Sequence, residues 1–129
     1  MSGPFIPDNV SQFIVEKIDS VAQLEALLLL RHNPEEQWCV RVLASRLYID
    51  EKQTAELLSD VCAKGIAIAI AGEPPRYQYK PSSLELQQTI DRVAEIYSKH
   101  LVPVTNLIHS KPKSRVQEFA DAFKFRKDE

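Results

Sequence analysis

The feature that most limits how this chain can fold is a short alternating segment, GIAIAIAGEPPRYQYK, which begins at Gly65. Isoleucine alternates with alanine before a Gly-Glu-Pro-Pro turn, and tyrosine alternates with polar residues after it. Alternation on both sides of a turn predicts a β-hairpin with one buried face. We expect that face to carry the isoleucines and the tyrosines, namely Ile66, Ile68, Ile70, Tyr77 and Tyr79.

Helices are expected before this hairpin, because apolar residues recur there at spacings of three and four. They cover about residues 7–18, 20–33, 35 or 37 to 47, and 50–64. Ser20 with Gln23, and Asp50 with Gln53, have the spacing of capping boxes, in which side chains bind the unpaired N–H groups of a first turn. Trp38 falls near the start of the third helix, where it is expected to anchor the packing on the first.

Two short helices, a tight turn between them, a glycine that closes the second and a hairpin directly after it form the order of a winged helix-turn-helix. The segment from about Ser20 to Pro81 resembles the winged-helix regulators of bacteria, of the broad type that includes MarR-like and PadR-like proteins. The resemblance rests on VLASRLYIDEKQTAELLSDVCAKGIA and the hairpin. It implies a cytoplasmic transcription regulator that binds DNA as a homodimer.

The chain after Pro81 is expected to be a long helical extension. We therefore divide the sequence into a winged helix-turn-helix domain, residues 1–81, and a C-terminal helical segment, residues 82–129. Pro103 predicts a kink or two helices in succession. Apolar residues recur at nearly heptad spacing, and we call this set the seam: Leu86, Ile90, Val93, Tyr97, Leu101, Val104 and Ile108. The seam either packs on the chain's own core or forms a dimer interface, and its length favours the dimer.

In a winged helix the helix after the turn enters the major groove, and the hairpin contacts the backbone or the minor groove. The residues that this arrangement would bring to DNA are Lys52, Gln53, Thr54, Lys64, Arg76 and Lys80. The same helix carries Glu56 and Asp60, and residues 35–64 hold six acidic against four basic side chains. Because DNA affinity depends on neutralising phosphates, this balance also favours an alternative without DNA.

The alternative is a winged helix that binds protein, as an adaptor or as a regulator of another regulator. Its contact surface would be the acidic pair Glu56 and Asp60, or the apolar stripe Val116, Phe119 and Phe123 in the tail. A third hypothesis is a sensor with a ligand pocket between the winged-helix domain and the long helix.

An enzyme is not expected. The three histidines belong to no nucleophile–base or HExxH motif, and there is no glycine-rich phosphate loop. Cys39 and Cys62 lack metal-ligand spacing and are expected to be free thiols, so neither a metal nor a cofactor is predicted.

The longest apolar run, Ala26 to Leu30, is too short to cross a bilayer, and no secretory signal is recognisable. A cytoplasmic protein is therefore expected.

Overall fold

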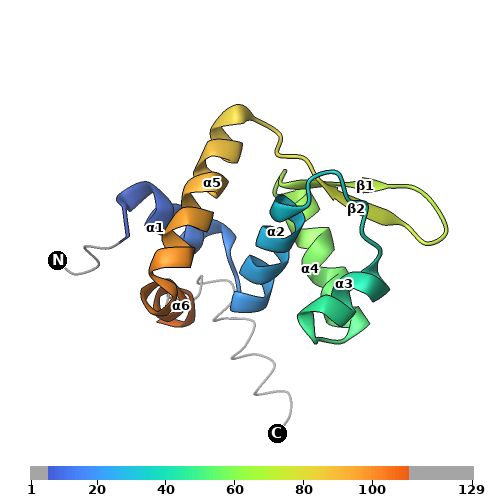
Figure 1. Cartoon of the computed structure of the whole chain (residues 1–129), viewed down its shortest axis with the longest axis horizontal. Coiled ribbons are helices and arrows are strands. Elements are labelled where there is room, and N and C mark those ends of the chain that lie inside the picture. The colour runs from blue at the N-terminus through green and yellow to red at the C-terminus, as the bar shows by residue number, and fades with distance from the viewer. Residues whose placement is uncertain (1–5, 111–129) are drawn as a thin grey trace, which may run out of the picture.

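The winged-helix order expected from the sequence is present in the computed structural model, which describes residues 6–110 (Figure 1). Its helices and strands are α1 (Asp8–Lys17), α2 (Val21–His32), α3 (Val40–Leu47), α4 (Glu51–Ala63), β1 (Ala67–Ile70), β2 (Arg76–Tyr79), α5 (Leu84–Lys99) and α6 (Leu101–Ser110). The fold is mainly helical, with the two strands paired as an antiparallel hairpin. Figure 1 shows α1, α5 and α6 on one side of α2, and α3, α4 and the hairpin on the other.

The helix ends follow the local chemistry of the sequence. Ser20 Oγ accepts the N–H of Gln23 at 3.1 Å, and Asp50 Oδ1 accepts the N–H of Gln53 at 2.7 Å. Gly65 lies in the left-handed region, with φ of 78°. The N–H of the next residue, Ile66, reaches back to the carbonyl of Val61, so the last turn of α4 closes as a Schellman motif.

The third helix begins later than expected, at Val40, and Trp38 is therefore not a helical residue. Its backbone is extended and pairs with Tyr77 of β2, each N–H donating to the other's carbonyl at 2.8 Å. This isolated bridge attaches the link between α2 and α3 to the hairpin. The expectation of a helix from residue 35 or 37 was wrong, because it overlooked this long-range pairing.

The register of the hairpin corrects the expected buried face. Tyr79 lies opposite Ala67, and Tyr77 lies opposite Ala69. Directly opposite residues in an antiparallel pair point to the same face, so the tyrosines share their face with alanines and not with the isoleucines of β1. Ile68 consequently lies on the other face and is 38% exposed.

The seam packs inside the chain. Its buried members share one hydrophobic cluster with residues of α1, α2, α3 and α4, and they are Ile90, Val93, Tyr97, Val104 and Ile108. Leu86 is partly buried, and Leu101 is 54% exposed. Of the two arrangements that the sequence left open, the structure therefore has the seam packed on the chain's own core and not free to form a dimer interface. The helix α1 packs against both α5 and α6.

The division at residue 81 separates two stretches of sequence that contribute to the same core. As Pro103 predicted, the described part of the C-terminal segment, residues 82–110, contains two helices, with α5 ending at Lys99 and α6 beginning at Leu101. The tail stripe of Val116, Phe119 and Phe123 lies outside the described residues. Between residues 6 and 110, no helix combines the length and the apolar character that crossing a membrane requires.

Candidate nucleic-acid interface

The first half of α4 carries two of the predicted DNA-contacting residues on the surface. Lys52 and Gln53 are exposed, and so is Glu51 beside them. Thr54 is completely buried, and its hydroxyl donates to the carbonyl of Asp50 at 2.8 Å. The prediction that Thr54 contacts DNA is therefore corrected, because its position on the helix faces Leu57 and Leu58 in the core.

A cleft of about 670 Å³ separates the start of α3 from the loop of the hairpin. Arg41 of α3 and Arg76 of β2 line it, together with Glu36 and Glu51. Cys39, the residue before α3, forms no side-chain cap, so the peptide N–H groups of the first turn give this wall a partial positive charge. Arg76 had been predicted at the interface; Arg41 had not, although its position in an exposed first turn could have indicated it.

The second strand of the hairpin carries a row of polar side chains at alternate positions. Arg76 and Lys80 are exposed, as predicted, and between them Gln78 donates its side-chain amide to the carbonyl of Pro34 at 3.0 Å. Lys80 follows the last residue of β2, at the opposite end of the strand from the loop. The row therefore places one cation beside the cleft and the other away from it.

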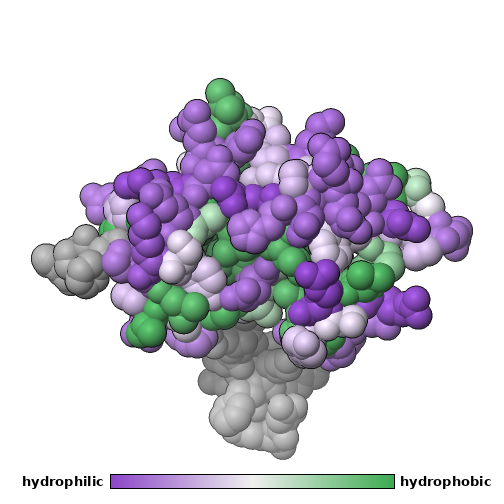
Figure 2. Space-filling view, viewed as in Figure 1, coloured by the Kyte–Doolittle hydropathy of each residue, from purple (hydrophilic) through white to green (hydrophobic). Residues whose placement is uncertain are grey.

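The surface around these residues is mixed. Figure 2 shows hydrophilic side chains over most of this face, with hydrophobic patches over α6 and near α3 and the hairpin. The exposed large hydrophobic residues of α6 are Leu101 and Val102, at 54% and 62% exposure, and Val42 of α3 is 44% exposed.

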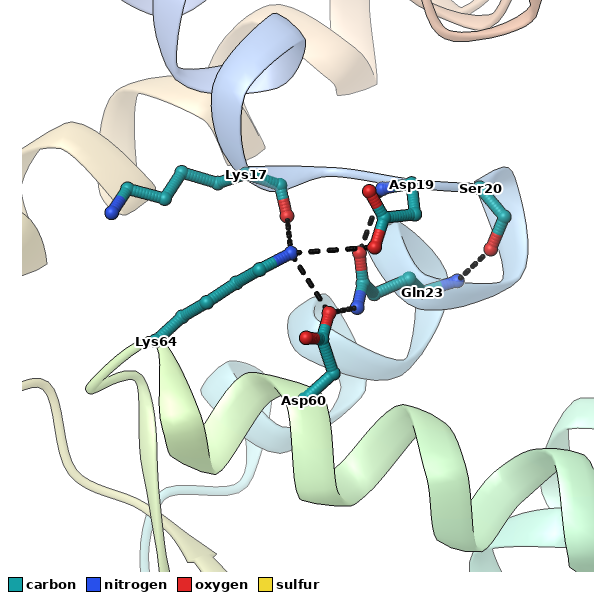
Figure 3. Close-up of polar contacts among 6 residues, drawn as sticks. All are labelled: Lys17, Asp19, Ser20, Gln23, Asp60 and Lys64. Carbon is teal, nitrogen blue, oxygen red and sulfur yellow. Dashed lines mark hydrogen bonds and ion pairs between the residues drawn. The ribbon is translucent and has the colours of Figure 1, made fainter. Parts of the chain in front are cut away.

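Lys64 is not at the interface. Its ammonium group donates to the carbonyl of Lys17 and forms ion pairs with Asp60 Oδ2 at 2.8 Å and Asp19 Oδ2 at 3.5 Å (Figure 3). The side chain is only 17% exposed. The prediction that Lys64 contacts DNA is corrected for this reason: its charge is already neutralised within the chain.

Gln23 completes this set of contacts, and the sequence indicated it only as a helix cap. Its amide nitrogen donates to Asp60 Oδ2 at 2.5 Å, and its amide oxygen accepts the N–H of Asp19 at 2.8 Å. Burial alone would raise the pKa of Asp60, but the hydrogen bonds from Lys64 and Gln23 outweigh it and hold that pKa below the usual value. Asp60 is thus an ionised, internally paired carboxylate, whereas Glu56 is exposed on the same helix.

A second hollow, of about 540 Å³, lies between α2, α3 and α5. At its edges Arg31 pairs with Asp91 at 2.8 Å, and the Tyr97 hydroxyl donates to Glu25 at 2.6 Å. Burial and the Glu25 carboxylate raise the pKa of Tyr97 to about 12, so its hydroxyl remains a donor at neutral pH. This is the position at which the sensor hypothesis requires a ligand. Across residues 6–110, no group of three or more acidic, histidine or cysteine side chains is arranged to hold a metal ion.

Comparisons with known proteins support the fold alone. No protein-family model matches the sequence, and no curated protein does. Among solved structures, the crystal structure of RV1404 from Mycobacterium tuberculosis is similar, with a TM-score of 0.51 and 11% sequence identity. The match covers 93% of this chain and 83% of the other, so the likeness includes the helices on both sides of the hairpin.

Proposed function

We propose that this chain is a DNA-binding transcription regulator that acts in the cytoplasm. The observation that carries the proposal is the cleft between the start of α3 and the hairpin loop, which Arg41 and Arg76 line. A winged helix uses these two elements and the following helix to hold a duplex. Lys52 and Gln53 are exposed in the first turn of α4 and would contact the duplex from there. Glu51 of that turn lines the cleft, whereas Gln53 borders a separate hollow with Asp19 and Ser20.

The charges of the surface set the strength of this binding. The exposed cations on α3, α4 and the hairpin strand are Arg41, Lys52, Arg76 and Lys80, with Arg46 further along α3. If the first four each neutralise one phosphate, log K should fall with log salt with a slope of about −3 to −4 for one copy of the chain. The proposal concerns one copy, because five of the seven seam residues, which were expected to pair two copies, are buried within the chain.

The test is a titration of labelled duplex DNA between about 50 mM and about 200 mM salt. Arg41→Ala and Arg76→Ala should each weaken binding and reduce the salt slope by about 0.9. Arg92→Ala is the matched control, because Arg92 is exposed on α5, where it pairs with Glu95 at 3.2 Å. No binding at the lowest salt by a folded wild-type protein, or an equal loss in all three variants, would contradict the proposal.

A protein partner is the second candidate, and one observation favours it. Beyond Gln53, the surface of α4 presents the exposed carboxylate of Glu56, whereas Asp60 and Lys64, which follow it in this described stretch, are paired with each other and leave no free basic group there. Such a face suits a basic protein surface. Glu56→Lys distinguishes the two candidates. If DNA lies along α4, this variant should bind DNA more tightly than the wild type; if this face binds only protein, neither protein should bind DNA.

A further inference from the structure

We infer that Lys64 is a positioning residue that fixes the end of α4 against α1 and α2, and thereby sets where the first turn of α4 lies. We call Lys17, Asp19, Gln23, Asp60 and Lys64 the Lys64 network (Figure 3). The expected effect on DNA binding rests on the proposed function. The expected effect on how firmly α4 is held against α1 and α2 does not.

The contacts of Lys64 join distant parts of the fold. Lys64 directly follows α4, and its ammonium reaches the carbonyl of Lys17, the last residue of α1. Carbonyls at a helix C-terminus lack helical partners and carry partial negative charge, which makes them favourable acceptors for a cation. Because α1 packs on α5 and α6, this one side chain connects the end of α4 to the helices on the other side of the core.

Gln23 makes the arrangement specific. It is only 3% exposed, and its amide nitrogen, amide oxygen and backbone N–H all have partners: Asp60, Asp19 and Ser20. Asp60 Oδ2 accepts from both Gln23 and Lys64. A buried polar group that loses a partner is costly, so a satisfied network favours one position of the helices, whereas apolar contacts tolerate sliding.

A small change at this end is amplified at the other end of α4. The helix has 13 residues and is therefore about 20 Å long. A tilt of about 10° at the last turn would move the first turn by about 3 Å, the length of one hydrogen bond. Lys52 and Gln53 lie in that first turn, so their contacts with a duplex depend on the Lys64 network at the far end.

The sharpest test is a substitution for which two explanations predict opposite signs. Asp60→Asn removes a negative charge from α4 while preserving the shape of the side chain. If Asp60 acts only by repelling phosphates, DNA binding should become tighter; if it positions α4, binding should weaken by about tenfold, as for the loss of one charged hydrogen bond. Glu56→Gln, one turn earlier on the exposed surface, is the matched control and should tighten binding.

Lys64→Met should weaken binding to a similar extent without changing the salt slope, because Lys64 contacts no phosphate. Lys52→Ala should instead reduce the slope by about 0.9. The double variant with Asp60→Asn should bind no worse than either single variant, since both break the same link. A reduced slope in Lys64→Met, or tighter binding in Asp60→Asn, would overturn the inference.

Amide hydrogen exchange without DNA tests the positioning separately from the proposed function. Asp60→Asn should accelerate exchange at both the first turn of α2 and the last turn of α4, and Glu56→Gln should not. If the wild-type protein binds no DNA, faster exchange at both places still supports the inference, and unchanged exchange overturns it. If the wild type binds DNA and exchange is unchanged in Asp60→Asn, the inference fails while the proposed function stands.

Discussion

The two ends of α4 are held in different ways. At its start, the contacts are local: Asp50 caps the helix through the N–H of Gln53, and the Thr54 hydroxyl binds the carbonyl of Asp50. At its end, Lys64 reaches a carbonyl 47 residues earlier, and Asp60 accepts from an amide 37 residues earlier. The first end is held by its own residues, whereas the second adds these long-range contacts to its local closure at Gly65.

This difference separates recognition from support within one helix. The locally capped end leaves Lys52 and Gln53 exposed, because a cap requires only the residues on either side of it. The end with long-range contacts binds its two charged side chains, Asp60 and Lys64, within the protein. Charge alone would suggest that Lys52 at one end and Lys64 at the other contribute equally to a DNA interface.

The largest effect on the free energy of unfolding is expected at the C-terminal end of α4, from Gly65→Ala. Gly65 has φ of 78°, a region that costs an L-residue about 1–2 kcal/mol. A Cβ there would also lie 2.7 Å from Ser82 Oγ, so Ser82 would have to move. We expect the free energy of unfolding to fall by about 2 kcal/mol, measured by urea denaturation.

Gly72→Ala is the matched control for that substitution. A Cβ at Gly72 would meet only the Pro74 carbonyl, at 3.3 Å, and Gly72 has no positive φ. Its effect should stay within about 0.5 kcal/mol, as is usual for exposed positions. Equal losses in both variants would show that the left-handed end of α4 does not carry the cost.

A smaller effect is expected at the start of α4, from Asp50→Ala. This change removes the acceptor for the N–H of Gln53, which should cost about 1 kcal/mol of unfolding free energy. Asp50→Asn keeps an oxygen at that position and should remain near the wild type in the same denaturation experiment. If Asn were as destabilising as Ala, the charge of Asp50 at the helix N-terminus would matter more than its hydrogen bond.

The same division explains what could be predicted from the sequence. The caps at Ser20 and Asp50, the end of α4 at Gly65 and the break near Pro103 depend on residues within a few positions of one another, and the structure has all of them. The order of helices and hairpin followed from these signals, so the mainly helical fold was predictable.

Long-range partners were not predictable. The pairing of Trp38 with Tyr77 shortened a helix, and the hairpin register placed alanines where isoleucines were expected. Heptad spacing showed that the seam has an apolar face, but spacing cannot indicate whether α1 or a second copy covers it. Of the residues predicted at the interface, Lys52 and Arg76 are exposed. Lys64 is not available there, because it binds acceptors such as the Lys17 carbonyl that lie far away in the sequence.

The smallest effect concerns the protonation of Asp60. Its pKa in the folded protein lies below the ordinary value of 3.8, because the bonds from Lys64 and Gln23 favour the carboxylate. The stability it contributes is therefore fully present above pH 3.8 and is lost as the pH falls through the lowered pKa. The difference in unfolding free energy between wild type and Asp60→Asn should shrink between about pH 5 and about pH 2, by a few tenths of a kcal/mol, since water screens this half-exposed group. Lys64→Met should show a weaker pH dependence than the wild type, because it lacks the cation that lowers the pKa. A difference that stays constant across this range would mean that Asp60 holds α4 by the geometry of its hydrogen bonds and not by its charge.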